Sequence, residues 1–395
     1  MITILVLASC TQSPERSEFT VSAQIDPGGI IRDVVVADFV AGDAKEVAVI
    51  LSGEVRMYQS NGTLRRSRTF PDAALGTAII HDVDTDGKPD LIIGSNGAPT
   101  AEVRVINGLL DTLTTVPIIP SIDGVTVPWR VDAGFVDVTT YSRANSAPKI
   151  AARVSLTDGT VSTLVPLGPR PTALDHSSTD GRWLISGMGI PVEGRNAPFP
   201  YRHRHDWNSL LFVDPEAFNP GDRVTHLPLD GPVGWDTLAG DAVSYPVARF
   251  FRTASGEERI AVVTNVMNSL SATETALTIL DTSGREIHHR TVPGTSEADL
   301  VALPDGSASP LAVGWSDVGE LWLVGDSGEI AARYTHPVDG HRLRLLSTGQ
   351  LDDDPDPEFL VGVGSQLLFL DDDLTEITRY DPGYRVRGAL IVERD

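Results

Sequence analysis

The chain has 395 residues, of which 41% are hydrophobic, enough apolar material for a sizeable core and too much for a disordered chain. Aspartate and glutamate outnumber lysine and arginine by 54 to 31, a net charge of −23. This charge argues against a nucleic-acid partner, because phosphate binding needs a basic surface, and it favours cation binding. No run of 18 apolar residues occurs, so no transmembrane helix is predicted.

The first twenty residues are predicted to form a signal segment and a tether. Residues 2–9 are almost entirely apolar and end in small side chains, and Cys10, the only cysteine, follows them. Leu7-Ala8-Ser9-Cys10 resembles the lipobox of bacterial lipoproteins, in which a peptidase cuts before the cysteine and a lipid is attached to its thiol. The resemblance implies lipidation at Cys10, a bacterial cell envelope location (periplasmic or surface-exposed), and membrane contact only through the anchor. The alternative is a buried N-terminal strand with an incidental cysteine.

One unit recurs along the rest of the chain. It ends in two alternating apolar strands joined by a short turn, as in Val55–Leu64 and Leu277–Gly284. Alternation around Asn-Gly, Asp-Gly or Ser-x-Gly is typical of β-hairpins. Another pair of apolar strands precedes each hairpin, such as Thr77–Ile80 and Leu91–Gly94. The turns occur at Gly62, Gly108, Gly159, Gly221, Gly284, Gly328 and Asp373.

Four short strands in units of roughly 40–50 residues are typical of propeller blades. Seven units predict an all-β fold, a seven-bladed β-propeller of four-stranded antiparallel blades, as a single domain over residues 21–395; eight blades is the alternative count. The segments Phe19–Ile25 and Val386–Val392 are also strand-like, and we expect them to pair across the seam of the ring. The expected blades are approximately residues 28–70, 71–120, 121–170, 171–230, 231–292, 293–336 and 337–395.

The loop from Asp82 to Asp90 carries the most specific chemistry. Carboxylates at its positions 1, 3, 5 and 9 can converge on one cation, and Gly87 at position 6 permits a sharp turn. Several charged oxygen ligands suit a hard cation such as Ca²⁺. An EF-hand would require Glu at position 12, where Ile93 stands, and flanking helices, whereas the flanks here are strand-like.

With strands on both sides, this loop resembles those of FG-GAP and VCBS repeats, β-propeller blades with a calcium loop between their first two strands, as in the integrin α-subunit head. The resemblance implies a Ca²⁺ cofactor and, as its ligands, the side chains of Asp82, Asp84, Asp86 and Asp90 with the carbonyl oxygen of Lys88. The alternative is an acidic, solvated hairpin turn.

Two further copies of the loop are degenerate. In the copy near the C-terminus, Pro355 replaces the turn glycine and the first position offers only an amide oxygen, so we expect weaker metal binding. The copy at Asp38–Glu46 keeps only the ends of the pattern and indicates a repeat turn without a metal. The predicted ligands of the weaker second loop are Gln350, Asp352, Asp354 and Glu358.

Two central repeats are longer than the others, and long insertions in compact folds are usually functional or disordered. Residues 175–235 contain several aromatic side chains and the run Arg202-His203-Arg204-His205-Asp206. Two histidines separated by one residue lie on the same face of a strand, and arginines can bind carboxylate or phosphate groups. The alternative is that the tryptophans pack on blade faces and the His–Arg run is solvated. The candidate ligand-binding residues are Arg202, His203, His205 and Trp207.

Sequence motifs of catalysis, such as G-x-S-x-G, H-E-x-x-H or a phosphate-binding loop, are missing, so no catalytic residue is predicted. We therefore expect a non-catalytic, calcium-stabilised binding or scaffold lipoprotein of the bacterial cell envelope, with a protein or glycan ligand. The alternative is an envelope or secreted polysaccharide hydrolase or lyase with its site in the loops of residues 175–235. A carboxylate pair of the glycosidase type cannot be recognised from sequence alone.

Overall fold

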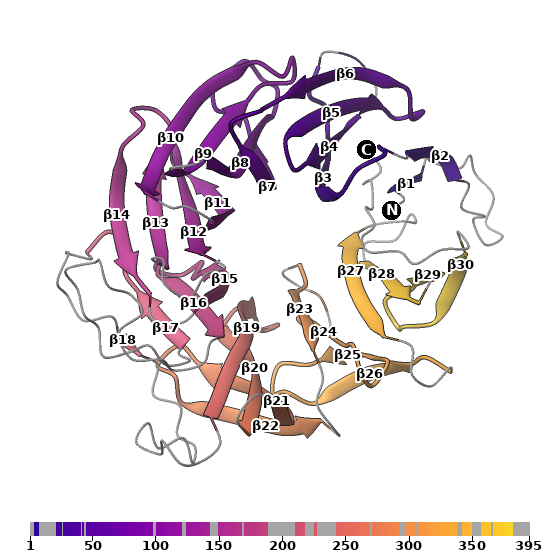
Figure 1. The fold of residues 1–395 in the computed structure, drawn as a ribbon. Helices are drawn as coiled ribbons and strands as arrows, with labels where there is room; N and C mark the ends of the chain where they lie inside the picture. The colour runs from indigo at the N-terminus through magenta and orange to yellow at the C-terminus, as the bar shows by residue number, and fades with distance from the viewer. Residues whose placement is uncertain are drawn as a thin grey trace.

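The structure is a computed structural model. In the residues that it describes, all regular secondary structure is β. Seven four-stranded antiparallel sheets follow one another along the chain and stand as blades around a ring (Figure 1). The predicted seven-bladed propeller is thus confirmed. No helix long and apolar enough to cross a bilayer occurs in this part of the chain. The described residues are 4–7, 21–25, 27–40, 42, 45–97, 100–120, 124–142, 149–167, 170–188, 210–217, 225–226, 242–268, 271–292, 297–304, 307, 309–337, 342–349, 357–364 and 366–381.

Each blade uses four consecutive strands, which pair in chain order. The first blade consists of β3 (Ile31–Ala37), β4 (Glu46–Leu51), β5 (Glu54–Gln59) and β6 (Leu64–Thr69). The second consists of β7 (Ala74–His81), β8 (Asp90–Gly97), β9 (Thr100–Ile106) and β10 (Thr112–Pro120). The third consists of β11 (Gly124–Asp132), β12 (Phe135–Ser142), β13 (Ile150–Ser155) and β14 (Val161–Pro166). The fourth consists of β15 (Arg170–His176), β16 (Trp183–Met188), β17 (Leu210–Val213) and β18 (Thr225–His226).

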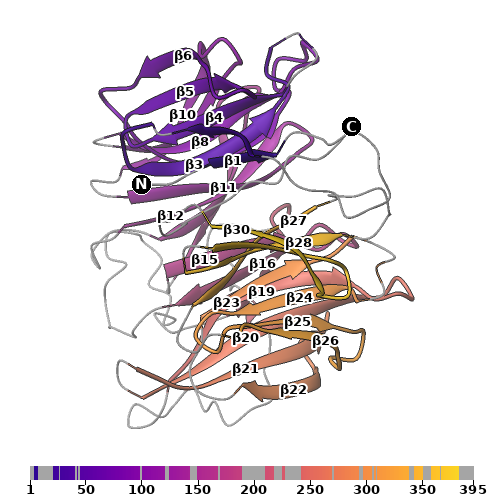
Figure 2. The ribbon, with the colours of Figure 1, turned by 90° about the vertical axis from the view of Figure 1, so that its right-hand side faces the viewer.

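The remaining three blades follow the same order. The fifth consists of β19 (Ala242–Arg252), β20 (Glu258–Asn268), β21 (Ser271–Asp281) and β22 (Glu286–Val292). The sixth consists of β23 (Ala298–Ala302), β24 (Leu311–Trp315), β25 (Glu320–Val324) and β26 (Ile330–Thr335). The seventh consists of β27 (Leu343–Gly349), β28 (Glu358–Val363), β29 (Gln366–Leu370) and β30 (Glu376–Tyr380). In each blade the first strand lies nearest the centre and the fourth lies outermost (Figure 1). Seen from the side, the strands run across the thickness of the ring (Figure 2).

Burial explains why the strands of one blade differ in sequence. The middle strands are covered on both faces by neighbouring blades, so β4, β24 and β25 are buried at every residue. Apart from the glutamate that begins β4 and β25, these strands contain no charged residue. The outer strands face solvent: β26 alternates between half-buried and exposed residues. Hairpin turns join the third and fourth strands, and Gly284 and Gly328 provide the positive φ angles of 88° and 91° that side chains disfavour.

The cores lie between blades. Six buried apolar clusters each join one blade to the next, as where Leu91 of β8 packs in one cluster with Ala48 of β4. A seventh cluster joins the first blade to Ile25, which packs with Val47 and Val49. The ring is therefore held by interfaces between successive sheets.

At the seam, β1 (Ile4–Leu7) pairs with β2 (Val21–Ile25) as a two-stranded antiparallel sheet between the first and seventh blades (Figure 1). The strand expected near Phe19–Ile25 is thus present, and its described partner is β1. Strand formation by Ile4–Leu7 agrees with the alternative of an N-terminal strand. Residues 386–392 and Cys10 lie outside the described residues, so their pairing and lipidation stay predictions.

Aspartates on three inner strands connect neighbouring blades through main-chain hydrogen bonds. The Oδ2 atom of Asp33 in β3 accepts from the backbone N–H of Ala78 in β7 at 2.8 Å. Burial raises the pKa of the Asp33 carboxyl, although the hydrogen bonds that it accepts oppose this effect. The other two bonds join Asp175 to the N–H of Phe250 at 2.8 Å and Asp299 to the N–H of Leu345 at 3.1 Å.

Candidate metal centre

The acidic loop of the second blade connects its first two strands. Asp82 directly follows β7, and Asp90 is the first residue of β8. β7 is mostly half-buried and the side chains of β8 that the structure describes are buried, and the two strands pair up to His81 and Asp90, which fixes both ends of the loop. Thr85 and Gly87 adopt positive φ angles of 62° and 85°, which turn the chain sharply between the two strands.

Three carboxylates converge in this loop. One oxygen each from Asp82, Asp84 and Asp86 lies within 4.8 Å of the others, with Asp82 half-buried and the other two exposed. The backbone N–H of Asp86 donates to Asp82 Oδ1 and to Asp84 Oδ1, both at 3.1 Å, and the N–H of Gly87 donates to Asp82 Oδ2 at 2.9 Å. The loop thus folds around its own carboxylates and holds them together.

The fourth predicted carboxylate has a different environment. Asp90 is buried and is not one of the three converging groups; its Oδ2 accepts from the N–H of Val83 at 2.9 Å. Burial raises the pKa of the Asp90 carboxyl, and the charges of Asp84 and Asp86 add to the rise against its main-chain hydrogen bonds. In this structure Asp90 closes the base of the loop.

The loop of the first blade shares this base but lacks the triad. Glu46, the first residue of β4, accepts through Oε2 from the N–H groups of Phe39 at 3.0 Å and Val40 at 3.3 Å. Val40 stands at the position that corresponds to Asp84, so the carboxylate cluster is lost. The Nζ of Lys88 crosses from the second blade to Asp38 Oδ2 at 2.5 Å, which connects the two loops. Metal binding by the Lys88 carbonyl stays a prediction.

The triad has the chemistry of a hard-cation site. Two like charges 4 Å apart repel by about 1 kcal/mol even in bulk water, and three carboxylates in this space multiply the repulsion. A divalent cation would remove it. Oxygen ligands with several full charges favour Ca²⁺ over transition metals.

A second triad, absent from the sequence predictions, occupies the turn between β29 and β30. One oxygen each from Asp371, Asp372 and Asp373 lies within 4.8 Å of the others. Thr375 donates through its N–H to Asp373 Oδ1 at 2.8 Å, and bonds from Thr375 lower the pKa of the Asp373 carboxyl. The sequence feature that could have predicted this cluster is the run of three consecutive aspartates in a predicted turn. The cluster is an acidic turn whose carboxylates converge as those of the loop between β7 and β8 do.

Most of the weaker second loop lies outside the described residues, including Gln350, Asp352 and Asp354. Glu358 is described: it is the first residue of β28, is fully buried, and stands where Glu46 and Asp90 stand in their blades. The candidate ligand-binding residues Arg202, His203, His205 and Trp207 also lie outside the described residues.

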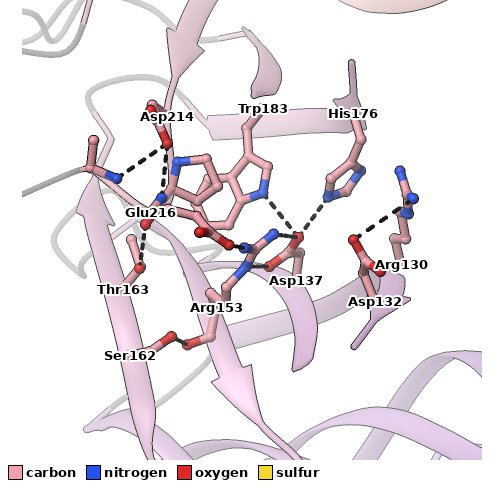
Figure 3. A network of polar contacts seen from close by, with 12 residues as sticks. Arg130, Asp132, Asp137, Arg153, Ser162, Thr163, His176, Trp183, Asp214 and Glu216 are labelled. Atoms are coloured by element: carbon pink, nitrogen blue, oxygen red, sulfur yellow. Dashed lines mark hydrogen bonds and ion pairs between the residues drawn. The ribbon is translucent and has the colours of Figure 1, made fainter. Parts of the chain in front are cut away.

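One tryptophan of the long central region belongs to a buried network of polar contacts. Trp183, the first residue of β16, is fully buried, and its Nε1 donates to Asp137 Oδ2 at 2.9 Å (Figure 3). The Nε2 of His176 lies 2.6 Å from the same oxygen, and Arg153 donates to both oxygens at 2.9 and 3.0 Å. Burial works to raise the pKa of Asp137, but hydrogen bonds and charge from Arg153 and His176 outweigh it and leave the pKa below its ordinary value.

This network joins the third blade to the fourth, since Asp137 and Arg153 lie on β12 and β13 and the other two residues on β15 and β16. Asp137 is 1% exposed and His176 is 8% exposed. The side chains of Arg153, His176 and Trp183 all converge on the Asp137 carboxylate (Figure 3). The network is therefore a structural connection, and Trp183 packs in a blade interface as the alternative interpretation of the central tryptophans expects.

Comparisons with known proteins agree on the fold. No protein-family model and no curated protein matches the chain. Among solved structures, dihydro-heme d1 dehydrogenase NirN is similar with a TM-score of 0.56 and 12% identity, over 85% of this chain and 63% of the NirN chain. The WD40 domain of Toxoplasma gondii coronin is similar with a TM-score of 0.50 and 10% identity, over 86% of each chain. The chain thus spans less than two thirds of the length of NirN. These similarities show a β-propeller fold.

Proposed function

We propose that this chain is a non-catalytic, calcium-stabilised propeller of the FG-GAP/VCBS type, which serves as a binding or scaffold module for a protein or glycan. We further propose that a lipid on Cys10 tethers it to a bacterial cell envelope. The observation that supports calcium best is the convergence of Asp82, Asp84 and Asp86 within 4.8 Å in a loop folded around their carboxylates. The tether rests on the lipobox-like residues Leu7–Cys10.

Calcium in this loop would stabilise more than one turn. The loop joins β7 to β8, and β7 contributes to the inner ring of strands (Figure 1). Lys88 of the same loop forms its ion pair with Asp38 of the first blade. A cation that fixes the loop therefore also fixes a contact between the first two blades.

A binding role agrees with how the ionisable groups are used. The Asp137 carboxylate and the imidazole of His176 hold blades together in the interior. The buried carboxylate of Glu258 likewise accepts hydrogen bonds from Ser177 Oγ at 2.6 Å and from the N–H of Ser178 at 2.6 Å. Groups of this kind are committed to structure, which leaves the exposed loops and outer strands for recognition.

The test of calcium binding is thermal unfolding with calcium or with chelator, together with calorimetric titration. Because the native state binds and the unfolded chain does not, calcium at 100 times its dissociation constant should stabilise the chain by ~2.7 kcal/mol. Asp84→Asn combined with Asp86→Asn should remove most of this shift. A matched control, Asp111→Asn with Asp132→Asn, removes two exposed carboxylates elsewhere and should leave the shift unchanged.

Equal melting of the wild type in calcium and in chelator, with no heat of binding at millimolar calcium, would show that the loop is only an acidic turn. A calcium shift that survives in the Asp84/Asp86 variant would place the site elsewhere in the chain.

A further inference from the structure

The outer strand of the first blade has an unusual charge. β6 has the sequence Leu-Arg-Arg-Ser-Arg-Thr, with three arginines and no acidic residue in a chain of net charge −23. The other described outer strands, β10, β14, β18, β22, β26 and β30, contain at most one arginine each. β6 pairs only with β5, so among the described strands its second edge has no partner.

A shallow groove, largely open to solvent, runs between β6 and the hairpin turn of the second blade. Its volume is about 500 Å³, and it is lined by Arg66, Ser67, Arg68, Leu109, Leu110 and Asp111. Leu64 at the start of β6 is 49% exposed and Leu109 is 46% exposed, so apolar surface accompanies the charged groups. Among the described residues six large apolar side chains are exposed, and Leu64 and Leu109 are two of them.

The two guanidinium groups of the groove are positioned and have hydrogen-bonding capacity to spare. Arg66 Nη1 donates to the carbonyl of Leu109 at 3.4 Å, and Arg68 Nη1 donates to that of Leu110 at 2.5 Å. Arg68 also lies 5.2 Å over the ring of Phe70 and 3.8 Å from the Asp111 carboxylate. Each guanidinium carries five N–H groups. The third arginine of the strand, Arg65, forms an ion pair with Glu46, so its guanidinium is not counted among the groups that would bind a ligand in the groove.

We propose that β6 and this groove form a docking site for an extended acidic peptide, which adds to the free edge of the first blade as a fifth strand. Main-chain hydrogen bonds along an edge provide affinity in this mode, and alternate side chains provide specificity. Arg66 and Arg68 are two residues apart and lie on one face of the strand, which matches carboxylates at alternate positions of an added strand. Residues between these carboxylates point to the opposite face of the added strand, where β-branched side chains favour the extended conformation without disturbing the arginine contacts.

The net negative charge of the chain favours binding of an acidic peptide at this edge over other edges. An acidic peptide is repelled by most of the surface, so the basic edge is distinguished from other strand edges by its charge. The inference gives a partner class to the binding role proposed above, and it depends neither on calcium nor on lipidation.

The experiment uses the full chain in chelator and a fluorescein-labelled peptide of alternating Val and Glu, with the Val–Lys peptide as its counterpart. Fluorescence anisotropy should show binding of the Val–Glu peptide only. Arg66→Glu with Arg68→Glu should weaken it by about tenfold or more, because two charge-assisted contacts become repulsive. Arg290→Glu with Arg379→Glu, the same charge change on β22 and β30, should have little effect. Arg66→Glu alone, which spares the Arg68–Phe70 contact, provides a second variant if the double variant does not fold.

Hydrogen exchange distinguishes strand addition from simple charge attraction. Saturation with the Val–Glu peptide should slow exchange in residues 64–69 and in no other outer strand. Equal binding of both peptides, unchanged affinity of the Arg66→Glu chain, or absence of protection at residues 64–69 would each overturn the proposal. Binding of phosphatidylglycerol vesicles, but not of the peptide, would also overturn it and assign the basic edge to a membrane surface.

Discussion

Removal of the Asp137 carboxylate tests how the third and fourth blades are joined. In Asp137→Ala the Arg153 guanidinium, whose side chain is 12% exposed, loses a partner that receives two hydrogen bonds. Loss of one partner from a buried ion pair costs about 3–5 kcal/mol. The Nε1–H of the fully buried Trp183 also loses its acceptor, and an unsatisfied buried donor costs about 1–3 kcal/mol. These costs overlap because they share one carboxylate, and Arg153 keeps its contact with the exposed Glu216 at 3.2 Å, so we expect a loss of about 3 kcal/mol.

Urea unfolding followed by tryptophan fluorescence measures this loss directly. Asp132→Ala is the matched control, because Asp132 is on the preceding strand β11, its side chain is 61% exposed, and it lies 3.9 Å from Arg130. A substitution at such a surface site should change the free energy of unfolding by less than about 0.5 kcal/mol. If the free energies of unfolding of the two variants lie within about 1 kcal/mol of one another, the network does not hold these blades together.

The stability difference between the wild type and Asp137→Ala should also depend on pH. The pKa of Asp137 in the folded chain lies below its ordinary value of 3.8, so its contribution to stability is fully present above that value. The contribution is lost as pH falls through the depressed folded pKa. The difference in stability between wild type and Asp137→Ala should therefore be constant from pH 7 to about pH 5 and should narrow only below about pH 4.

Two further substitutions test other features of the chain. Gly94→Ala should destabilise the ring by about 1–3 kcal/mol, because a Cβ there would lie 2.0 Å from the carbonyl oxygen of Thr126 in the next blade. Gly53→Ala is the control and should be tolerated, because the nearest atom to its Cβ would lie at 3.7 Å. Equal melting temperatures for the two variants would refute the close approach at Gly94. Expressed in bacteria with a complete signal peptide, the chain should incorporate labelled palmitate and Cys10→Ala should not; labelling that persists in the variant would eliminate the anchor.

The architecture could be predicted from the sequence because its signals are local. A hairpin turn such as Asp281–Gly284 is recognisable from adjacent residues, and seven turns at propeller spacing leave few alternatives. The loop from Asp82 to Asp86 was recognisable for the same reason, since its carboxylates converge through backbone bonds within five residues.

The Asp137 network could not be predicted, because its partners come together only when blades pack. His176 is 39 residues from Asp137 along the chain, and Trp183 is 46 residues from it. Spacing along one strand gives no sign of such a contact. The environment of Asp90 was likewise beyond sequence analysis, since its place at the buried start of β8 directs one oxygen to the N–H of Val83.

The aspartates of β3, β15 and β23 have a consequence for how such a ring can diverge in sequence. Each accepts a hydrogen bond from a main-chain N–H of the following blade: Ala78, Phe250 or Leu345. Every amino acid except proline supplies that donor, so the receiving position is free to change its side chain. Neighbouring blades can drift independently while the connection between them persists. The three residues whose N–H groups donate have unlike side chains: a methyl group, an aromatic ring and a branched aliphatic chain.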